Sequence, residues 1–175
     1  IAPSDEPVRL IRAKVAGLTL AAITPILKAY AHVMEQLLRR REWRVDGAPA
    51  LQHAVDAAGQ NNRNTIRSLL VEALRFHPVF PVLQRYAPRD TVIASGLERE
   101  YRVPAGTNVV VALLSGMFDD TAVERSEEFR SDRQERSYLH FGSGTHFCLG
   151  ATIAVDILTE MVRATLRLPR FAQAE

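Results

Sequence analysis

The sequence predicts an α+β fold of mainly helical character, with small β-sheets. Two long stretches carry apolar residues at helical spacing, and two short runs rich in β-branched residues adjoin turn signals. The 175 residues are 47% apolar and 24% charged, a balance that is typical of a globular chain and sufficient for one sizeable core. We therefore expect one compact, ordered domain.

The first helix is expected from about Val8 to Arg41. Its middle, from Val15 to Leu27, is apolar on nearly every side, as in a helix threaded through a larger core. This apolar run has 13 residues between two lysines, fewer than the roughly 18 to 20 that a membrane helix requires. Pro25 removes a backbone N–H and is expected to kink the helix. The sequence thus predicts a buried, kinked helix and no membrane span.

A second helix is predicted from Thr65 to Phe76, because its apolar residues recur at the spacing that lines one helical face. Prolines end it, and short strands are expected at Thr91 to Ala94 and, after the turn signal PAGT, at Asn108 to Leu114. These strands predict a small sheet. The residues of the helical face are Ile66, Leu69, Leu70, Ala73 and Leu74, and the prolines are Pro78 and Pro81.

The C-terminal third combines an irregular stretch with a helix. Asp119 to Leu139 is rich in charge and lacks periodicity, so we expect an ordered loop. An amphipathic helix is predicted to begin just after Cys148, the only cysteine. The N–H groups and the dipole of that helix start favour a thiolate over a thiol. The expected apolar stripe comprises Ile153, Ala154, Ile157, Leu158, Met161 and Val162, with Asp156, Glu160 and Arg163 opposite.

Charge and cysteine content exclude several classes of protein. The 22 basic residues nearly balance the 20 acidic ones and are scattered along the chain, which argues against a nucleic-acid-binding stripe. A single cysteine cannot form an intrachain disulfide, and no signal-peptide pattern is present, so we predict a cytoplasmic location. From the residues alone, Cys148 is an inert buried thiol, a nucleophile or a metal ligand, but a zinc site would require further ligands at a recognisable spacing.

The segment HFGSGTHFCLGA carries a motif of six residues: Phe141, Gly142, Gly144, His146, Cys148 and Gly150. These residues match, complete and in register, the haem-binding signature of the cytochromes P-450, which this chain resembles. A second family motif, Glu-x-x-Arg, is present as Glu72 and Arg75. The resemblance implies a partial cytochrome P-450 fold, in which Cys148 is the catalytic axial thiolate ligand of haem b iron and the six motif residues hold the cofactor.

The resemblance extends over nearly the whole chain. It implies that residues 1–175 form the C-terminal haem-thiolate portion of such a domain, from a long helix through the cysteine loop to the helix that follows it. The family's N-terminal helices have no counterpart in this chain. We therefore expect further N-terminal residues in the same polypeptide.

The same resemblance implies roles for residues outside the cysteine loop. Glu72, Arg75 and Arg133 are expected to form a buried triad whose loss would release haem. Arg85, His146 and Tyr138 are expected to bind haem propionates. The family often has histidine at the position of Tyr138, and a phenol can donate the same kind of hydrogen bond.

The long helix departs from the family pattern. Monooxygenases of the family usually carry Ala/Gly-Gly-x-Asp/Glu-Thr there, and the acid and hydroxyl deliver protons to bound dioxygen. Aligning AAITP with this motif places Thr24 at the acid position and Pro25 at the alcohol position, whereas the alternative register, AGLTL, places Thr19 and Leu20 there. Both registers lack a carboxylate, and Thr24 is the remaining candidate for a proton relay.

The missing carboxylate favours an oxidant that needs less proton delivery. We predict a haem-thiolate oxidoreductase that uses peroxide or rearranges hydroperoxides of an apolar, lipid- or terpenoid-like substrate. The alternatives are a dioxygen-dependent monooxygenase fed by a ferredoxin and its reductase, and a non-catalytic haem-binding or sensor module. The expected substrate pocket is lined by Ala21, Ala22, Pro25, Phe80, Pro81 and Val82.

Overall fold

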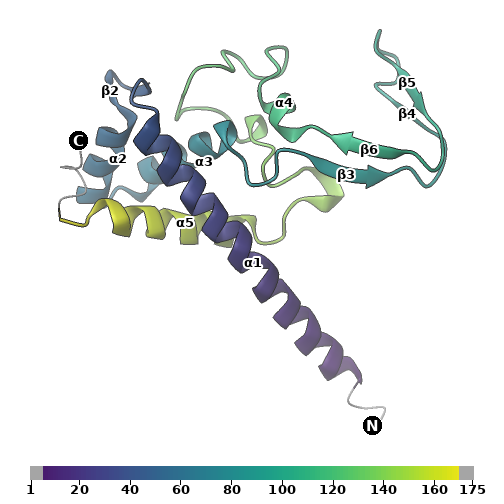
Figure 1. Ribbon diagram of the computed structural model, residues 1–175, viewed down its shortest axis with the longest axis horizontal. Coiled ribbons are helices and arrows are strands. Elements are labelled where there is room, and N and C mark those ends of the chain that lie inside the picture. The colour runs from purple at the N-terminus through teal and green to yellow at the C-terminus, as the bar shows by residue number, and fades with distance from the viewer. Residues whose placement is uncertain (1–5, 170–175) are drawn as a thin grey trace.

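The computed structural model describes residues 6–169, which form helices and three small antiparallel sheets (Figure 1). This architecture confirms the predicted α+β class. The helices are α1 (Glu6–Arg39), α2 (Ala50–Gly59), α3 (Arg63–Phe76), α4 (Leu113–Met117) and α5 (Ala151–Leu166), with 3-10 turns η2 (Glu135–Ser137) and η3 (Gly144–His146). The strands are β1 (Arg44–Val45), β2 (Ala48–Pro49), β3 (Leu83–Tyr86), β4 (Thr91–Ile93), β5 (Tyr101–Val103) and β6 (Asn108–Val111).

The hydrophobic core lies where α2, α3, α5 and the C-terminal half of α1 meet. Figure 1 shows α1 crossing α5, with α2 and α3 gathered at the C-terminal end of α1. Asn62 caps the start of α3 by accepting a hydrogen bond from the Thr65 N–H at 3.2 Å. The predicted apolar face of α3 is confirmed, because Ile66, Leu69, Leu70, Ala73 and Leu74 are all buried.

The N-terminal half of α1 is exposed, so the prediction of a buried helix is wrong for this part. All residues from 6 to 24 are exposed, and Leu20 retains 69% of its accessible surface. No other element among residues 6–169 covers this stretch, which explains the difference. The helix continues through Pro25, so the expected distortion does not interrupt it.

By length and composition alone, α1 qualifies as a candidate membrane-spanning helix. The apolar run from Val15 to Leu27 is shorter than α1, which contains it. The length of this run therefore does not exclude a membrane-spanning helix. A core helix of a soluble protein meets the same criterion.

The strands pair as β1–β2, β3–β6 and β4–β5, all antiparallel. Strands predicted at 91–94 and 108–114 correspond to β4 and β6, but the second prediction is wrong at its end, since β6 stops at Val111 and α4 follows. The sequence interpretation missed β3, β5, the β1–β2 hairpin and α2. The buried positions of α2 are all alanines, which give a weak periodic signal: Ala50, Ala54, Ala57 and Ala58.

Helix α5 begins just after Cys148, as predicted, but it buries a different face from the expected stripe. Ile153 and Ile157 are exposed, because the buried face is displaced around the helix from these two positions. The stretch from Asp119 to Leu139 forms turns and one 3-10 turn, in agreement with the ordered loop that was predicted. The buried face of α5 consists of Ala151, Val155, Leu158, Thr159, Val162 and Leu166.

Candidate functional site

The loop that carries Cys148 is held in shape by its own backbone. The N–H of Cys148 donates to the carbonyl of Phe141 at 2.9 Å, and the N–H of Phe147 donates to the carbonyl of Gly144 at 3.0 Å. At the other end, Ala151 N–H donates to the Cys148 carbonyl at 3.2 Å as α5 begins. These bonds place an exposed thiol at the N-terminal end of a 16-residue helix, where the helix dipole favours negative charge.

Two glycines of the loop adopt a backbone conformation that other residues rarely tolerate. Gly142 has φ +76° and Gly144 has φ +65°, both in the left-handed region. A Cβ atom at Gly142 would also lie 3.3 Å from the carbonyl oxygen of His146. At Gly150 a Cβ atom would meet nothing within 4 Å, so open space lies beside the start of α5.

The side chains around the thiol are apolar and exposed. Phe147 retains 56%, Leu149 87% and Ile153 66% of their accessible surface. Clusters of exposed apolar side chains often mark binding sites, whereas single exposed apolar residues are common on any surface. This cluster is therefore a candidate binding surface for an apolar group. The loop thus joins an exposed sulfur to an apolar surface.

Glu72 and Arg75 of α3 form an ion pair with both side chains at 0% exposure. The pair is bidentate, with Arg75 Nη2 donating to Glu72 Oε1 at 2.9 Å and Arg75 Nε donating to Glu72 Oε2 at 3.1 Å. The Arg75 guanidinium also lies 4.6 Å from the centre of the Phe118 ring and donates to the carbonyl of Met117. The pair therefore ties α3 to the end of α4 and the loop that follows.

Arg133 completes this buried cluster from the irregular stretch between α4 and the cysteine loop. Its Nε donates to Glu72 Oε1 at 3.1 Å, and its two Nη atoms donate to carbonyl oxygens of Glu124, Arg125 and Glu128. The backbone N–H of Arg130 donates to Glu72 Oε1 as well, at 3.0 Å. The buried carboxylate of Glu72 therefore accepts hydrogen bonds that hold the loop of residues 117–133 against α3.

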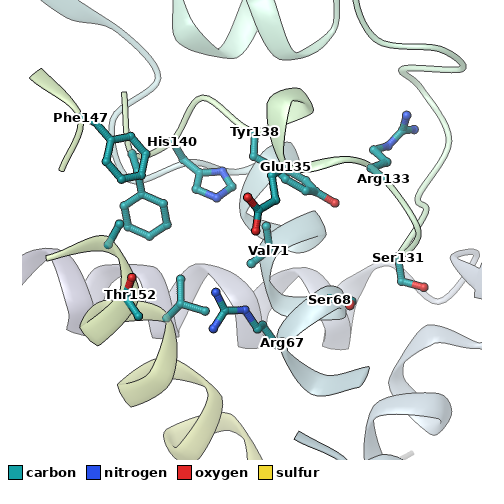
Figure 2. Close-up of a pocket in the computed structure, with 13 residues that line it drawn as sticks. Arg67, Ser68, Val71, Ser131, Arg133, Glu135, Tyr138, His140, Phe147 and Thr152 are labelled. Atoms are coloured by element: carbon teal, nitrogen blue, oxygen red, sulfur yellow. The ribbon is translucent and has the colours of Figure 1, made fainter. Parts of the chain in front are cut away.

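A pocket of about 340 Å³ opens between α3, α5 and the segment that leads into the cysteine loop. Figure 2 shows Tyr138 and His140 lying between Arg133 and Phe147, with Glu135 beside them and Arg67 across the pocket. Burial and the nearby Glu72 carboxylate raise the pKa of Tyr138, while burial lowers the pKa of His140 to about 4. The sequence interpretation did not single out His140, because a lone histidine beside the motif gave no signal.

The residues expected to bind propionates come from different parts of the chain. Arg85 is exposed on β3 and donates to the carbonyl of its neighbour Gln84, and His146 is exposed in η3. Tyr138 is partly buried near Glu72. The shared role of these three side chains stays a prediction.

The residues expected on the substrate side belong to α1 and to the segment after α3. Ala21, Ala22 and Thr24 are exposed on α1, and Pro25 is half-buried. Phe80, Pro81 and Val82 are exposed before β3. Lys28 Nζ donates to the Val79 carbonyl at 3.1 Å, which brings the two stretches into the same neighbourhood.

Comparison with known proteins identifies the family. A family model described as Cytochrome P450 matches residues 51–171, well over half of the chain. The chain belongs to the cytochrome P-450 family. It is 33% identical to the cyclomarin C epoxidase CymV of Salinispora arenicola over 159 residues, covering 87% of the chain and 38% of the relative. It is 32% identical to an erythromycin C-12 hydroxylase of Saccharopolyspora erythraea, again covering 87% of the chain and 38% of the relative.

Solved structures agree with this membership. The chain matches CYP164A2 of Mycobacterium smegmatis, crystallised with econazole, with a TM-score of 0.63, at 26% identity, over 83% of the chain and 32% of that structure. It matches the cytochrome P-450 haem domain of Tepidiphilus thermophilus with a TM-score of 0.64 at 21% identity, covering 82% of the chain and 31% of that structure. The chain thus spans less than two fifths of the length of these relatives.

Membership of the cytochrome P-450 family implies a haem cofactor, and the residues of the cysteine loop fit one. The thiol of Cys148 is exposed at a helix N-terminus, a donor suited to an iron centre. Gly150 leaves open space beside the thiol, and Phe147 and Leu149 offer exposed apolar surface for a flat macrocycle. His146 is exposed in the same loop, where it could meet a negatively charged edge.

Proposed function

We propose that Cys148 is the axial thiolate ligand of haem b in an oxidoreductase that acts on an apolar substrate. The observation that carries this proposal is the exposed thiol at the start of α5, in a loop whose shape requires Gly142 and Gly144. The haem supplies oxidising chemistry, and a thiolate ligand favours cleavage of an O–O bond. In this proposal residues 1–175 are the C-terminal haem-thiolate portion of the domain.

The buried cluster of Glu72, Arg75 and Arg133 is proposed to keep the cysteine loop in place. Arg133 lies 15 positions before Cys148 in the chain, so its buried anchorage limits where the loop can begin. Arg85, His146 and Tyr138 are proposed to bind the propionates. Ala21, Ala22, Pro25, Phe80, Pro81 and Val82 are proposed to line a mostly apolar pocket for a lipid- or terpenoid-like substrate.

The oxidant is proposed to be a peroxide or a hydroperoxide of the substrate. Between Glu6 and Glu35, α1 contains no acidic residue, so no carboxylate of this helix can deliver protons on the substrate side. Thr24 has a hydroxyl one position before Pro25 and is the proposed proton relay. A peroxide arrives already reduced, so it requires less proton delivery than dioxygen does.

A dioxygen-dependent monooxygenase is the second candidate. The names of the relatives favour it, since they include an epoxidase and a hydroxylase. This route requires two electrons from outside, which a ferredoxin with its reductase would supply. Arginines on the surface would suit an acidic partner.

The test uses the complete natural polypeptide that contains this chain. Its carbon-monoxide difference spectrum after reduction should show thiolate ligation, and Cys148→Ser should abolish that signal while circular dichroism stays unchanged. A spectrum retained by Cys148→Ser would refute the ligand assignment. Product formation from a hydroperoxide without an electron donor supports the first route, whereas turnover only with NADPH, ferredoxin and reductase supports the second.

A further inference from the structure

Two histidines that take no part in the proposed haem site lie in direct contact at the junction of α1 and α3. His32 is on α1, and His77 is the residue that follows the last turn of α3. Their rings are stacked with centroids 3.7 Å apart and an interplanar angle of 7°. The His77 side chain is 44% exposed, so solvent protons reach the pair.

Hydrogen bonds join the stacked rings to the backbone of His77 and to Gln36 of α1. His32 Nδ1 lies 2.9 Å from the carbonyl oxygen of His77, which can only accept, so this nitrogen carries a proton. Gln36 Nε2 lies 3.4 Å from His77 Nδ1, and the Oε1 atom of the same amide is buried without a partner among the described residues. The backbone and the ring of His77 are therefore both in contact with side chains of α1.

Charged groups of α1 surround His77 and oppose one another. Partial burial, His32 and Lys28 lower the pKa of His77, with burial as the largest cause, while Glu35 raises it. Glu35 Oε2 lies 3.7 Å from His77 Nδ1, but Oε1 of the same carboxylate pairs with Arg39 at 3.1 Å. Because the pKa of His77 lies below its ordinary value in the folded chain, His77 binds a proton more readily when it leaves the stack, so acid favours separation.

The stack also determines how the chain leaves α3. His77 is bonded to α1 through its carbonyl and its ring, and two residues later the Val79 carbonyl accepts from Lys28. Phe80, Pro81 and Val82 follow, and then β3 begins. We propose that His32 and His77 form a proton-sensitive latch between α1 and residues 77–82, closed when the His77 imidazole is neutral and released as it takes up a proton. The latch requires no haem and goes beyond the proposed function.

Hydrogen exchange of the complete polypeptide tests the latch directly. After correction for the intrinsic effect of pH, the amide of Leu114, which donates to the Pro81 carbonyl at 3.0 Å, should exchange faster at about pH 5.5 than at about pH 8. Amides in the middle of α5 should show no such change. Equal corrected rates at the two pH values would overturn the proposal.

Matched glutamine variants separate the latch from a general effect of acid. His77→Gln should remove the pH dependence of exchange at the Leu114 amide, and His53→Gln on α2, outside the stack, should leave it as in the natural protein. Circular dichroism at both pH values checks that each variant is folded. A His77→Gln variant that retains the full pH dependence would overturn the proposal.

A titration of the natural protein needs no variant. Ring resonances followed by NMR should show His77 titrating below about 6.5, together with a chemical-shift change in His32 at the same midpoint, because the rings are in contact. Titration of His77 at its ordinary value of about 6.5 would contradict the latch. Loss of the thiolate spectrum, by contrast, would refute only the haem assignment.

Discussion

The loop of residues 117–133 and the N-terminal half of α1 are stabilised in opposite ways. The loop is rich in charge, and besides its buried Met117, Val123 and Phe129, a buried carboxylate of α3, two buried guanidinium groups and several backbone carbonyls hold it in place. The half-helix is rich in apolar residues, among them Leu10, Leu18 and Leu20, yet nothing among residues 6–169 covers it. The difference shows that a charged segment can be fixed by a few buried contacts with a neighbouring helix, whereas an apolar helix depends on what packs against its whole face.

Removal of the Glu72 carboxylate should produce the largest loss of stability. Glu72→Gln would leave the guanidinium groups of Arg75 and Arg133 buried without a counter-charge, and we expect the free energy of unfolding to fall by about 3–5 kcal/mol. Urea denaturation measures the change. Glu135→Gln, at an exposed acid in the same part of the chain, should change stability by less than about 0.5 kcal/mol. Equal effects at the two positions would mean that Glu72 does not organise the loop.

Matched leucine truncations compare the core with the exposed half of α1. Leu70→Ala removes a side chain with 0% exposure and should cost about 2–5 kcal/mol. Leu20→Ala removes one that no described element covers and should change the free energy of unfolding by less than about 0.5 kcal/mol. Thermal and urea denaturation of both variants provide the measurement. A large loss for Leu20→Ala would show that this side chain is covered in the natural protein.

The sequence predicted those parts of the fold whose signal is local. The spacing of Leu69, Leu70 and Ala73 defined the buried face of α3, and the glycine-rich motif placed Cys148 just before α5. Helix α2 was missed because alanine gives a weak periodic pattern. The exposure of α1 was missed because an apolar run does not reveal whether another element covers it.

The sequence predicted which side chains belong to the candidate site, but it did not predict the backbone groups that they contact. Glu72 and Arg75 are three positions apart and could be paired from the sequence, whereas Arg133 was placed only by resemblance to the family. The remaining contacts of the cluster involve the backbone, namely the N–H of Arg130 and the carbonyls of Met117 and Glu128. Backbone groups are the same in every residue, so no sequence pattern reports where they converge.

The smallest expected effects on stability come from two glycine substitutions, which should change the free energy of unfolding in opposite directions. Gly144→Ala should cost about 1–2 kcal/mol, because a Cβ atom is strained at φ +65° although the space around it is open. Gly59→Ala, in the last turn of α2 and equally unobstructed, should stabilise the protein by about 0.5–1 kcal/mol, since alanine loses less backbone entropy on folding. Urea denaturation distinguishes the two signs. A loss at both positions would point to side-chain crowding, whereas a loss at Gly144 alone shows that the cysteine loop depends on its backbone conformation.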